Sequence, residues 1–337
     1  MLLRIVLAGW IGIVIAGSLG ACASRPAPAA APRLVPAERA RALPIFDRAG
    51  APVEWKALVS ACAAADAVLI GEAHGQPEGQ AFEEALFRDV LAAAPGAVAA
   101  LEFFERDQQP DLDDYLLGVT DEAAMRTATS RSPSGYPPGH RAMVEASRAA
   151  ARPVIAANAP RRYVRLARTD GYERLAALSP SQRALFRIPS LLPQGRYRDD
   201  FFRVMGADPA AADVEPAAPD AQDTDSPAHG DARASAATTV EGMFRAQSLW
   251  DWTMADSVAR ALGVAGPAPE TGAPRPVVLV VGVFHVEHGG GLVQALRLLR
   301  PDTRIVTVCM ALTGETSPRA EDKDRADFVV HVGPSLR

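Results

Sequence analysis

Short apolar runs alternate along the chain with longer stretches in which apolar residues recur every three or four positions. The apolar runs predict strands, and the recurring pattern predicts helices. The predicted strands cover residues 67–72, 98–104, 153–158, 276–285, 303–310 and 328–332. The predicted helices cover residues 78–94, 141–151, 161–168, 240–262 and 291–299. Because the two kinds of element alternate, we expect an α/β fold, with a largely parallel sheet covered by helices and a helical lobe.

The first residues of the chain follow a different pattern, which is typical of an export signal. Arg4 precedes a short apolar core at 5–15, and small residues follow up to Cys22. This core is too short for a transmembrane helix, which needs about 20 apolar residues. The sequence Leu-Gly-Ala-Cys that ends at Cys22 resembles a lipobox, so residues 1–22 are interpreted as a lipoprotein signal peptide. The alternative is a secreted protein that is cleaved after an Ala-x-Ala-like site.

A lipid on Cys22 would hold the protein at a membrane surface. Ala23 follows where retention in the inner membrane would call for aspartate, so the bacterial outer membrane, with the domain facing the periplasm, is the expected location. Residues 23–40 are rich in Ala and Pro and are interpreted as a tether. The remaining residues, 41–337, form the domain, and their segment 206–239 is expected to be a disordered acidic insertion because it has almost no large apolar side chain.

The net charge argues against a nucleic-acid-binding protein, and the cysteine content argues against a disulfide-stabilised one. The 337 residues have a formal charge of -5 and a pI near 5.7, which gives no basic surface for nucleic acid. Three cysteines are too few for a disulfide framework. Cys62 and Cys309 lie in apolar segments and are interpreted as small buried side chains, and a disulfide between them is not expected.

Ionisable residues stand where three of the predicted strands end. Glu72 and His74 lie two residues apart, Glu102 interrupts the second apolar run, and His285 ends the fourth. The carboxyl ends of parallel strands meet at one crevice, and a buried carboxylate is costly unless it is paired or bound to a cation. Two imidazoles and two carboxylates suit a divalent transition metal, or a polar cluster that supports another cofactor. A single histidine at a strand end is more often structural, but the four residues together predict a functional site.

Several short motifs carry a resemblance to a known family. They are LIGEAH at 69–74, LEFF at 101–104, RDQ at 106–108, YPP at 136–138, AANAPR at 156–161, AQSLWD at 246–251, MA at 254–255 and GVFH at 282–285. Their order, from about residue 45 to residue 332, resembles that of the ChaN family, which are haem-binding lipoproteins of the Tiki-like superfamily. The acidic insertion is the main interruption of this order.

The resemblance implies a role in haem and iron uptake. It implies haem as the cofactor, haem iron held by a tyrosine, and two haems stacked between the subunits of a homodimer. It also implies an outer-membrane haem receptor as a partner of the protein. A phenolate oxygen is a hard ligand that suits ferric iron.

Two tyrosines are candidates for this ligand. Tyr197 is preferred because arginines that could pair with haem propionates and phenylalanines that could cover the porphyrin surround it. The alternative for Tyr197 is an amphipathic surface helix that buries its aromatic face. Tyr136 is the second candidate, and its alternative role is a turn, since two prolines follow it.

Further polar residues are expected to border the cleft. Arg161 opens a helix, where the backbone amides and the helix dipole favour an anion such as a propionate. The alternative for Arg161 is a solvated side chain. Gln247 and Asp251 recur at a spacing of four, so they share one helix face that also carries apolar residues.

The resemblance also leaves a rival function open, because Tiki-like relatives include metal-dependent proteases. Glu72, His74, Glu102 and His285 would then bind a metal ion whose water attacks an amide or ester. One of the carboxylates would act as general base. A third alternative is a surface lipoprotein whose cleft is only structural.

Overall fold

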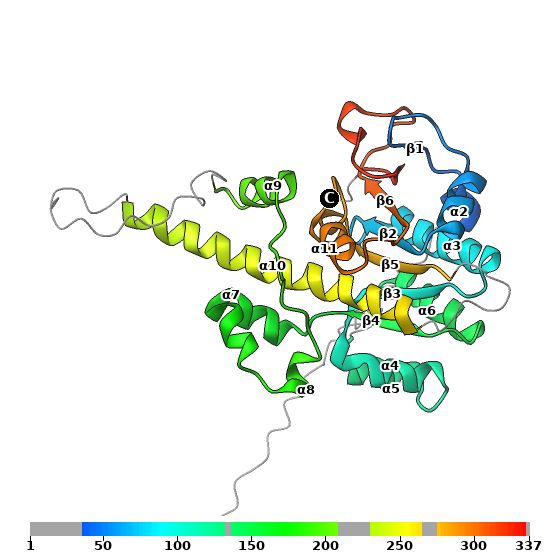
Figure 1. Ribbon diagram of the computed structural model, residues 1–337. Helices are drawn as coiled ribbons and strands as arrows, with labels where there is room; N and C mark the ends of the chain where they lie inside the picture. The colour runs from blue at the N-terminus through cyan, green and yellow to red at the C-terminus, as the bar shows by residue number, and fades with distance from the viewer. Residues whose placement is uncertain (1–35, 132–135, 208–229, 265–274, 335–337) are drawn as a thin grey trace, which may run out of the picture. The chain divides into compact units, whose positions relative to one another are not determined.

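The computed structural model describes residues 36–131, 136–207, 230–264 and 275–334. The predicted signal peptide, its Cys22 and most of the predicted tether lie outside these residues. Within them, one seven-stranded sheet has the order β1-β7-β6-β2-β5-β3-β4, in which every pairing is parallel except that of β1 with β7 (Figure 1). The strands are β1 (Ile45–Asp47), β2 (Ala67–Glu72), β3 (Val98–Glu105), β4 (Val154–Asn158), β5 (Val277–Gly282), β6 (Ile305–Ala311) and β7 (Phe328–His331).

The helices lie between these strands in the chain. They are α1 (Ala37–Arg41), α2 (Trp55–Ala64), α3 (Pro77–Ala93), α4 (Gln109–Leu116), α5 (Glu122–Ala128), α6 (Pro138–Ala149), α7 (Arg161–Ala176), α8 (Pro180–Arg183), α9 (Arg196–Val204), α10 (Gly230–Val264) and α11 (Gly291–Leu299). Short 3-10 turns in the described residues include η1 (Arg106–Gln108), η4 (Val283–His285) and η5 (Ala320–Asp322). No helix in the described part of the chain is long and apolar enough to cross a membrane.

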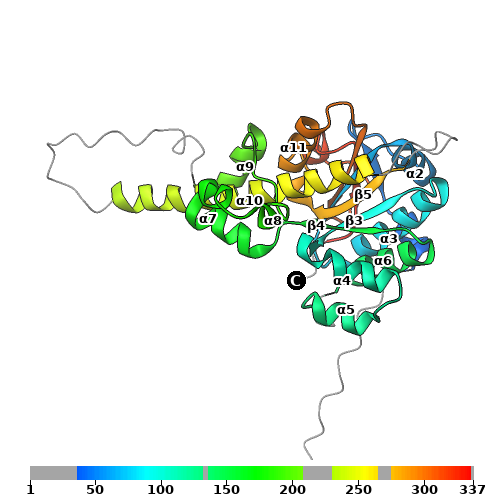
Figure 2. The same ribbon diagram turned by 60° about the horizontal axis from the view of Figure 1, so that its bottom comes forward.

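The sheet is covered on both faces, as its strand sequences require. Every residue of β2 and of β5 is buried, which explains why both strands are apolar without alternation. One face packs against α2, α3 and α6 through side chains such as Val68 and Leu86. The other face packs against α10 and α11 through side chains such as Leu69 and Trp252. Figure 2 shows the sheet between α10 and α11 on one side and α3 and α6 on the other.

A helical lobe extends the second layer. α7 packs on α10 through a cluster that contains Tyr163 and Leu249, and the segment after α8 joins this cluster through Phe186. α9 packs on α10 through an aromatic cluster of Tyr197, Phe201 and Phe244. The lobe therefore consists of α7, α8 and α9 arranged along one long helix (Figure 1).

The central strands β2 and β5 lie side by side and are parallel, but the chain leaves their carboxyl ends towards opposite faces of the sheet. After β2 it enters α3 on one face and continues to β3, whereas after β5 it enters α11 on the other face and continues to β6. Adjacent parallel strands whose connections diverge in this way open a crevice at their carboxyl ends, and ligands of α/β proteins bind there. The topology thus places a candidate site after β2 and β5.

The α/β fold predicted from the sequence is confirmed, with differences at some element ends. The predicted strand 276–285 ends at Gly282, because the chain turns into η4 before His285. The long helix α10 begins at Gly230 and so includes the last residues of the predicted insertion, whose residues 208–229 lie outside the described chain. α1 covers Ala37–Arg41, so the folded part begins within the predicted tether. β1 is too short to have been predicted, and its pairing with β7 makes it a strand.

Candidate functional site

Two groups of polar side chains lie at the carboxyl ends of the central strands. The Glu72 cluster, which consists of Glu72, His74, Glu83 and His140, follows β2. The Asp251 cluster, which consists of Tyr197, Gln247, Asp251 and His285, follows β5. Both clusters have a buried carboxylate at their centre.

Glu72 lies between two imidazoles. One carboxylate oxygen is 2.5 Å from Nδ1 of His74, and the other is 2.8 Å from Nε2 of His140. Burial opposes the charged form of Glu72, but His140 and then His74 outweigh it and lower the pKa of the carboxyl. The hydrogen bond to Glu72 in turn raises the pKa of His74. The side chain of His74 is 56% exposed, so the Glu72 cluster presents one oriented imidazole to solvent.

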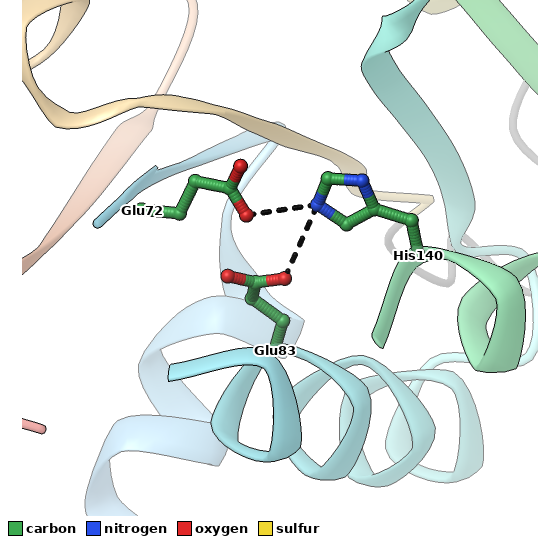
Figure 3. Close-up of side chains that lie close together, drawn as sticks. All are labelled: Glu72, Glu83 and His140. Carbon is green, nitrogen blue, oxygen red and sulfur yellow. Dashed lines mark hydrogen bonds and ion pairs between the residues drawn. The ribbon is translucent and has the colours of Figure 1, made fainter. Parts of the chain in front are cut away.

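The inner half of the Glu72 cluster is fully buried. Oε2 of Glu83, on α3, lies 3.4 Å from Nε2 of His140, on α6 (Figure 3). The two helices can approach closely because residue 139 is glycine. A Cβ atom at Gly139 would lie only 2.6 Å from the backbone oxygen of Gln80. Burial and then the charge of Glu72 raise the pKa of Glu83 well above its usual range. Burial opposes a charge on His140, but Glu72 outweighs it and raises the pKa of His140 to about 10.

The Asp251 cluster holds a phenol and an imidazole on one carboxylate. Tyr197 on α9 donates its hydroxyl to Oδ2 of Asp251 at 2.7 Å, and Nδ1 of His285 lies 2.6 Å from Oδ1. The amide of Gln247 donates to the Tyr197 hydroxyl at 3.2 Å. Burial and then Asp251 raise the pKa of Tyr197 well above its usual range. Burial opposes a charge on His285, but Asp251 outweighs it and raises the pKa of the imidazole.

Gly282 lies between the two clusters, at the end of β5. A Cβ atom at this position would lie 3.0 Å from Nε2 of His74 and 3.7 Å from Cδ2 of His285, so both imidazole rings border it. The backbone N–H of Gly282 donates to Oε2 of Glu102 at 2.7 Å, and Oε1 of Glu102 lies 3.9 Å from Nε2 of His285. A side chain at this position would therefore displace the exposed ring of His74.

The structure therefore brings together most of the residues that were predicted from the sequence. Glu72, His74, Glu102 and His285 surround the end of β5, and Tyr197 joins them through Asp251.

Tyr136 and Arg161 belong to other parts of the structure. Tyr136 is buried in the core on the α6 side of the sheet, where its ring packs edge-on against Phe104. Arg161 is 88% exposed at the start of α7 and pairs with Glu105 at 3.6 Å. Neither residue forms a hydrogen bond or ion pair with the two clusters among the interactions of the described residues. Cys62 and Cys309 are free and buried, as expected.

Glu83 and His140 were not predicted as site residues. Glu83 lies four residues after Gly79 and four before Phe87, on the buried face of α3. A carboxylate within an apolar helix face is a detectable signal, because such a group is almost never fully buried without a partner. His140 follows two prolines at the start of α6 and offers no comparable signal.

Ligands of α/β proteins bind at the carboxyl edge of the sheet, where the central strands diverge. This edge carries carboxylate–imidazole pairs here, so the fold and the site define an α/β protein with a candidate site for a small ligand. Residues 58–296 match the family described as haem-binding uptake, Tiki superfamily, ChaN. Because this match covers more than half of the chain, the protein belongs to the ChaN family of haem-binding uptake proteins, as the motif order indicated.

A solved structure agrees on the fold. The chain is similar to ChaN of Campylobacter jejuni, whose structure is described as showing cofacial haem binding, with 14% identity, a TM-score of 0.57 and coverage of 86% of this chain and 96% of that chain. It is more distantly similar to the type III effector HopBA1, with 12% identity, a TM-score of 0.41 and coverage of 83% and 93%. At 14% identity, the likeness to ChaN of C. jejuni shows the fold alone. No curated protein matches the chain.

Proposed function

We propose that this protein binds haem at the carboxyl edge of its sheet and that Nε2 of His74 is the iron ligand. The observation that carries the proposal is the geometry of His74, whose ring is exposed while Nδ1 is held by Glu72 at 2.5 Å. Histidines that bind metals typically place their other ring nitrogen on a carboxylate in this way, which fixes the tautomer and directs the free nitrogen outward. The haem iron supplies the Lewis acid that accepts the lone pair of this nitrogen.

Tyr197 stays a prediction as the iron ligand, and its surroundings favour it less than those of His74. Its ring is buried in the aromatic cluster of α9, and its hydroxyl is bonded to Asp251. A phenolate ligand must lose its proton, whereas burial and the charge of Asp251 favour the protonated phenol. Ligation by Tyr197 therefore requires α9 to move away from α10. The same argument applies to Tyr136, whose pKa is raised mainly by burial.

The wider role follows from residues outside the described chain. The lipobox-like sequence at Cys22 supports export, lipid anchoring and a location at the outer membrane facing the periplasm. A homodimer and a haem receptor as partner are part of the same proposal. The cofacial haem binding described for ChaN of C. jejuni supports the homodimer, since two cofacial haems need more surface than a single cleft. Arg161 is retained as a candidate for a propionate contact because it is exposed.

Titration with haemin tests the proposal. We expect a Soret shift with the unmodified protein, and its loss in His74→Ala, while Tyr197→Phe keeps it. The matched control is His288→Asn, which removes another partly exposed histidine. Asparagine tolerates the positive φ of this position as histidine does. Absence of a Soret shift in the unmodified protein would contradict haem binding, and loss of the shift in Tyr197→Phe alone would assign the ligand to Tyr197.

A hydrolase is the second candidate function, and one observation favours it. Both imidazoles that border Gly282 are oriented by carboxylates, His74 by Glu72 and His285 by Asp251. Oriented imidazoles are suited to general acid–base catalysis, and with Glu102 they could hold a divalent metal ion. Chelator-sensitive hydrolysis of peptides or esters that is lost in His285→Ala would support this function, whereas haem binding without any hydrolysis would rule it out.

A further inference from the structure

The inner half of the Glu72 cluster consists of Glu72, Glu83 and His140, and it has two carboxyl groups for one imidazole. Glu72, Glu83 and His140 come from β2, α3 and α6, and each is at most 3% exposed. Two carboxyl groups there face one imidazole, and neither makes an ion pair with a lysine or arginine among the described residues. Burying a carboxylate without a compensating cation is costly. Without a further cation, only one of the two carboxyls can stay ionised beside His140, in line with the raised pKa of Glu83.

Glu83 also lacks the hydrogen bonds that a buried carboxylate needs. Neither of its oxygens has a hydrogen-bond partner among the described residues, although the side chain is completely enclosed. In Figure 3 its carboxyl group points towards Glu72 and the ring of His140. Buried polar atoms that remain unpaired commonly mark the place of an ion or a water molecule.

The spacing of the donor atoms fits an ion. Nε2 of His140 lies 2.8 Å from an oxygen of Glu72 and 3.4 Å from an oxygen of Glu83, and one ligand atom from each residue lies within 4.8 Å of the others. Four ligands at about 2.0–2.1 Å from a tetrahedral metal ion are about 3.3 Å apart. His140 and Glu83 already have this spacing, and His140 and Glu72 would reach it if their donor atoms moved apart by about 0.5 Å.

We propose that Glu72, Glu83 and His140 form a buried site for a divalent transition metal ion of the zinc class. A divalent cation between two carboxylates and a neutral imidazole has no net charge, which favours its burial. Mixed carboxylate and imidazole donors suit zinc, manganese or ferrous iron, whereas calcium and magnesium prefer sites made only of oxygen. Glu83 can contribute both oxygens, and Glu72 still holds His74 with its other oxygen. The ion would tie α3 and α6 to the end of β2.

Metal analysis of haem-free protein, purified without a metal-affinity tag, tests the site. After incubation with zinc and dialysis, we expect about one zinc per chain by mass spectrometry, and with cobalt a visible absorption band typical of tetrahedral coordination. Glu83→Gln should lose both signals. The control is Glu84→Gln, which removes the next carboxylate on α3, one that pairs with Arg88, and should bind as the unmodified protein does.

Thermal unfolding gives a second readout that does not depend on recovery of metal. Zinc should raise the Tm of the unmodified protein and of Glu84→Gln, a chelator should reverse the rise, and Glu83→Gln should respond to neither. Unmodified protein with less than about a tenth of an equivalent of zinc and no response of Tm would overturn the site. Binding that survives in Glu83→Gln would also overturn it. Because haem is absent, failure here leaves the haem proposal untouched.

Discussion

The two clusters at the carboxyl edge share a plan but differ in exposure. Each has a buried carboxylate that holds an imidazole through Nδ1, Glu72 with His74 and Asp251 with His285. In the Glu72 cluster that imidazole is 56% exposed, whereas His285 is enclosed beneath α9 and Tyr197. Burial, rather than the hydrogen-bond pattern, thus decides which of two similar pairs can meet a ligand. We interpret the Asp251 cluster as the rigid support and His74 as the group that binds.

The largest effect is expected from breaking the Asp251 cluster. Asp251→Ala leaves Tyr197 and His285 without their shared partner in a closed environment, and loss of one partner from a buried ion pair costs about 3–5 kcal/mol. Urea unfolding measures the free energy of unfolding. Asp251→Asn, which keeps the volume and one acceptor oxygen, should lose less. A loss below about 1 kcal/mol in Asp251→Ala would show that this cluster is not a support.

Tyr197→Phe sharpens the comparison by removing only the hydroxyl group. The carboxylate of Asp251 then loses one donor, which is expected to cost about 2 kcal/mol, since hydrogen bonds to charged groups contribute about 1.5–3 kcal/mol. The aromatic packing on Phe284 and Phe244 should remain. If the stability is unchanged, the phenol does not hold the Asp251 cluster in solution.

Gly282→Ala tests the space between the clusters. The added Cβ atom would lie 3.0 Å from Nε2 of His74, so the exposed ring must move away. We expect the free energy of unfolding to change by less than about 1 kcal/mol, because His74 can shift into solvent. Haem affinity should fall by about 10- to 100-fold, the usual effect of misorienting a metal ligand. Unchanged affinity in a haemin titration would argue against His74 as the ligand.

The smallest effect is expected in Glu102→Gln, which should shift the pH dependence of haem binding. An imidazole must be neutral to bind iron, and Glu72 raises the pKa of His74, with Glu102 contributing and His140 opposing. Affinity should therefore be complete above this raised pKa and fall by about tenfold per pH unit below it, because one proton must leave. Haemin titrations across the pH range measure this. The midpoint should move to lower pH in Glu102→Gln, and a midpoint that moves higher would contradict the assignment.

The sequence predicted most of the fold because the central elements have strong patterns. β2 and α11 have the predicted bounds, since β2 is fully buried and α11 has one continuous apolar face. α9 was recognised only as an alternative for Tyr197, since a short amphipathic helix is stable only when its aromatic face packs on a partner.

The site could be predicted only where a residue follows a strand directly. His74 and His285 come just after β2 and β5, so the topology of a parallel sheet brings them to one edge. Glu83 and His140 lie on helices, and His140 meets Glu72 across 68 positions of sequence. No local pattern encodes that contact.

The sequence by itself thus determined the alternation of strands and helices, the covered sheet and the placement of ionisable residues at its carboxyl edge, because these depend on local periodicity and on the direction of the chain. Only the tertiary structure decided that His74 is exposed, that Tyr197 is bonded to Asp251, and that Glu83 lies beside His140. Burial and pairing depend on contacts between residues far apart in the chain, and these contacts decide which polar groups can meet a ligand.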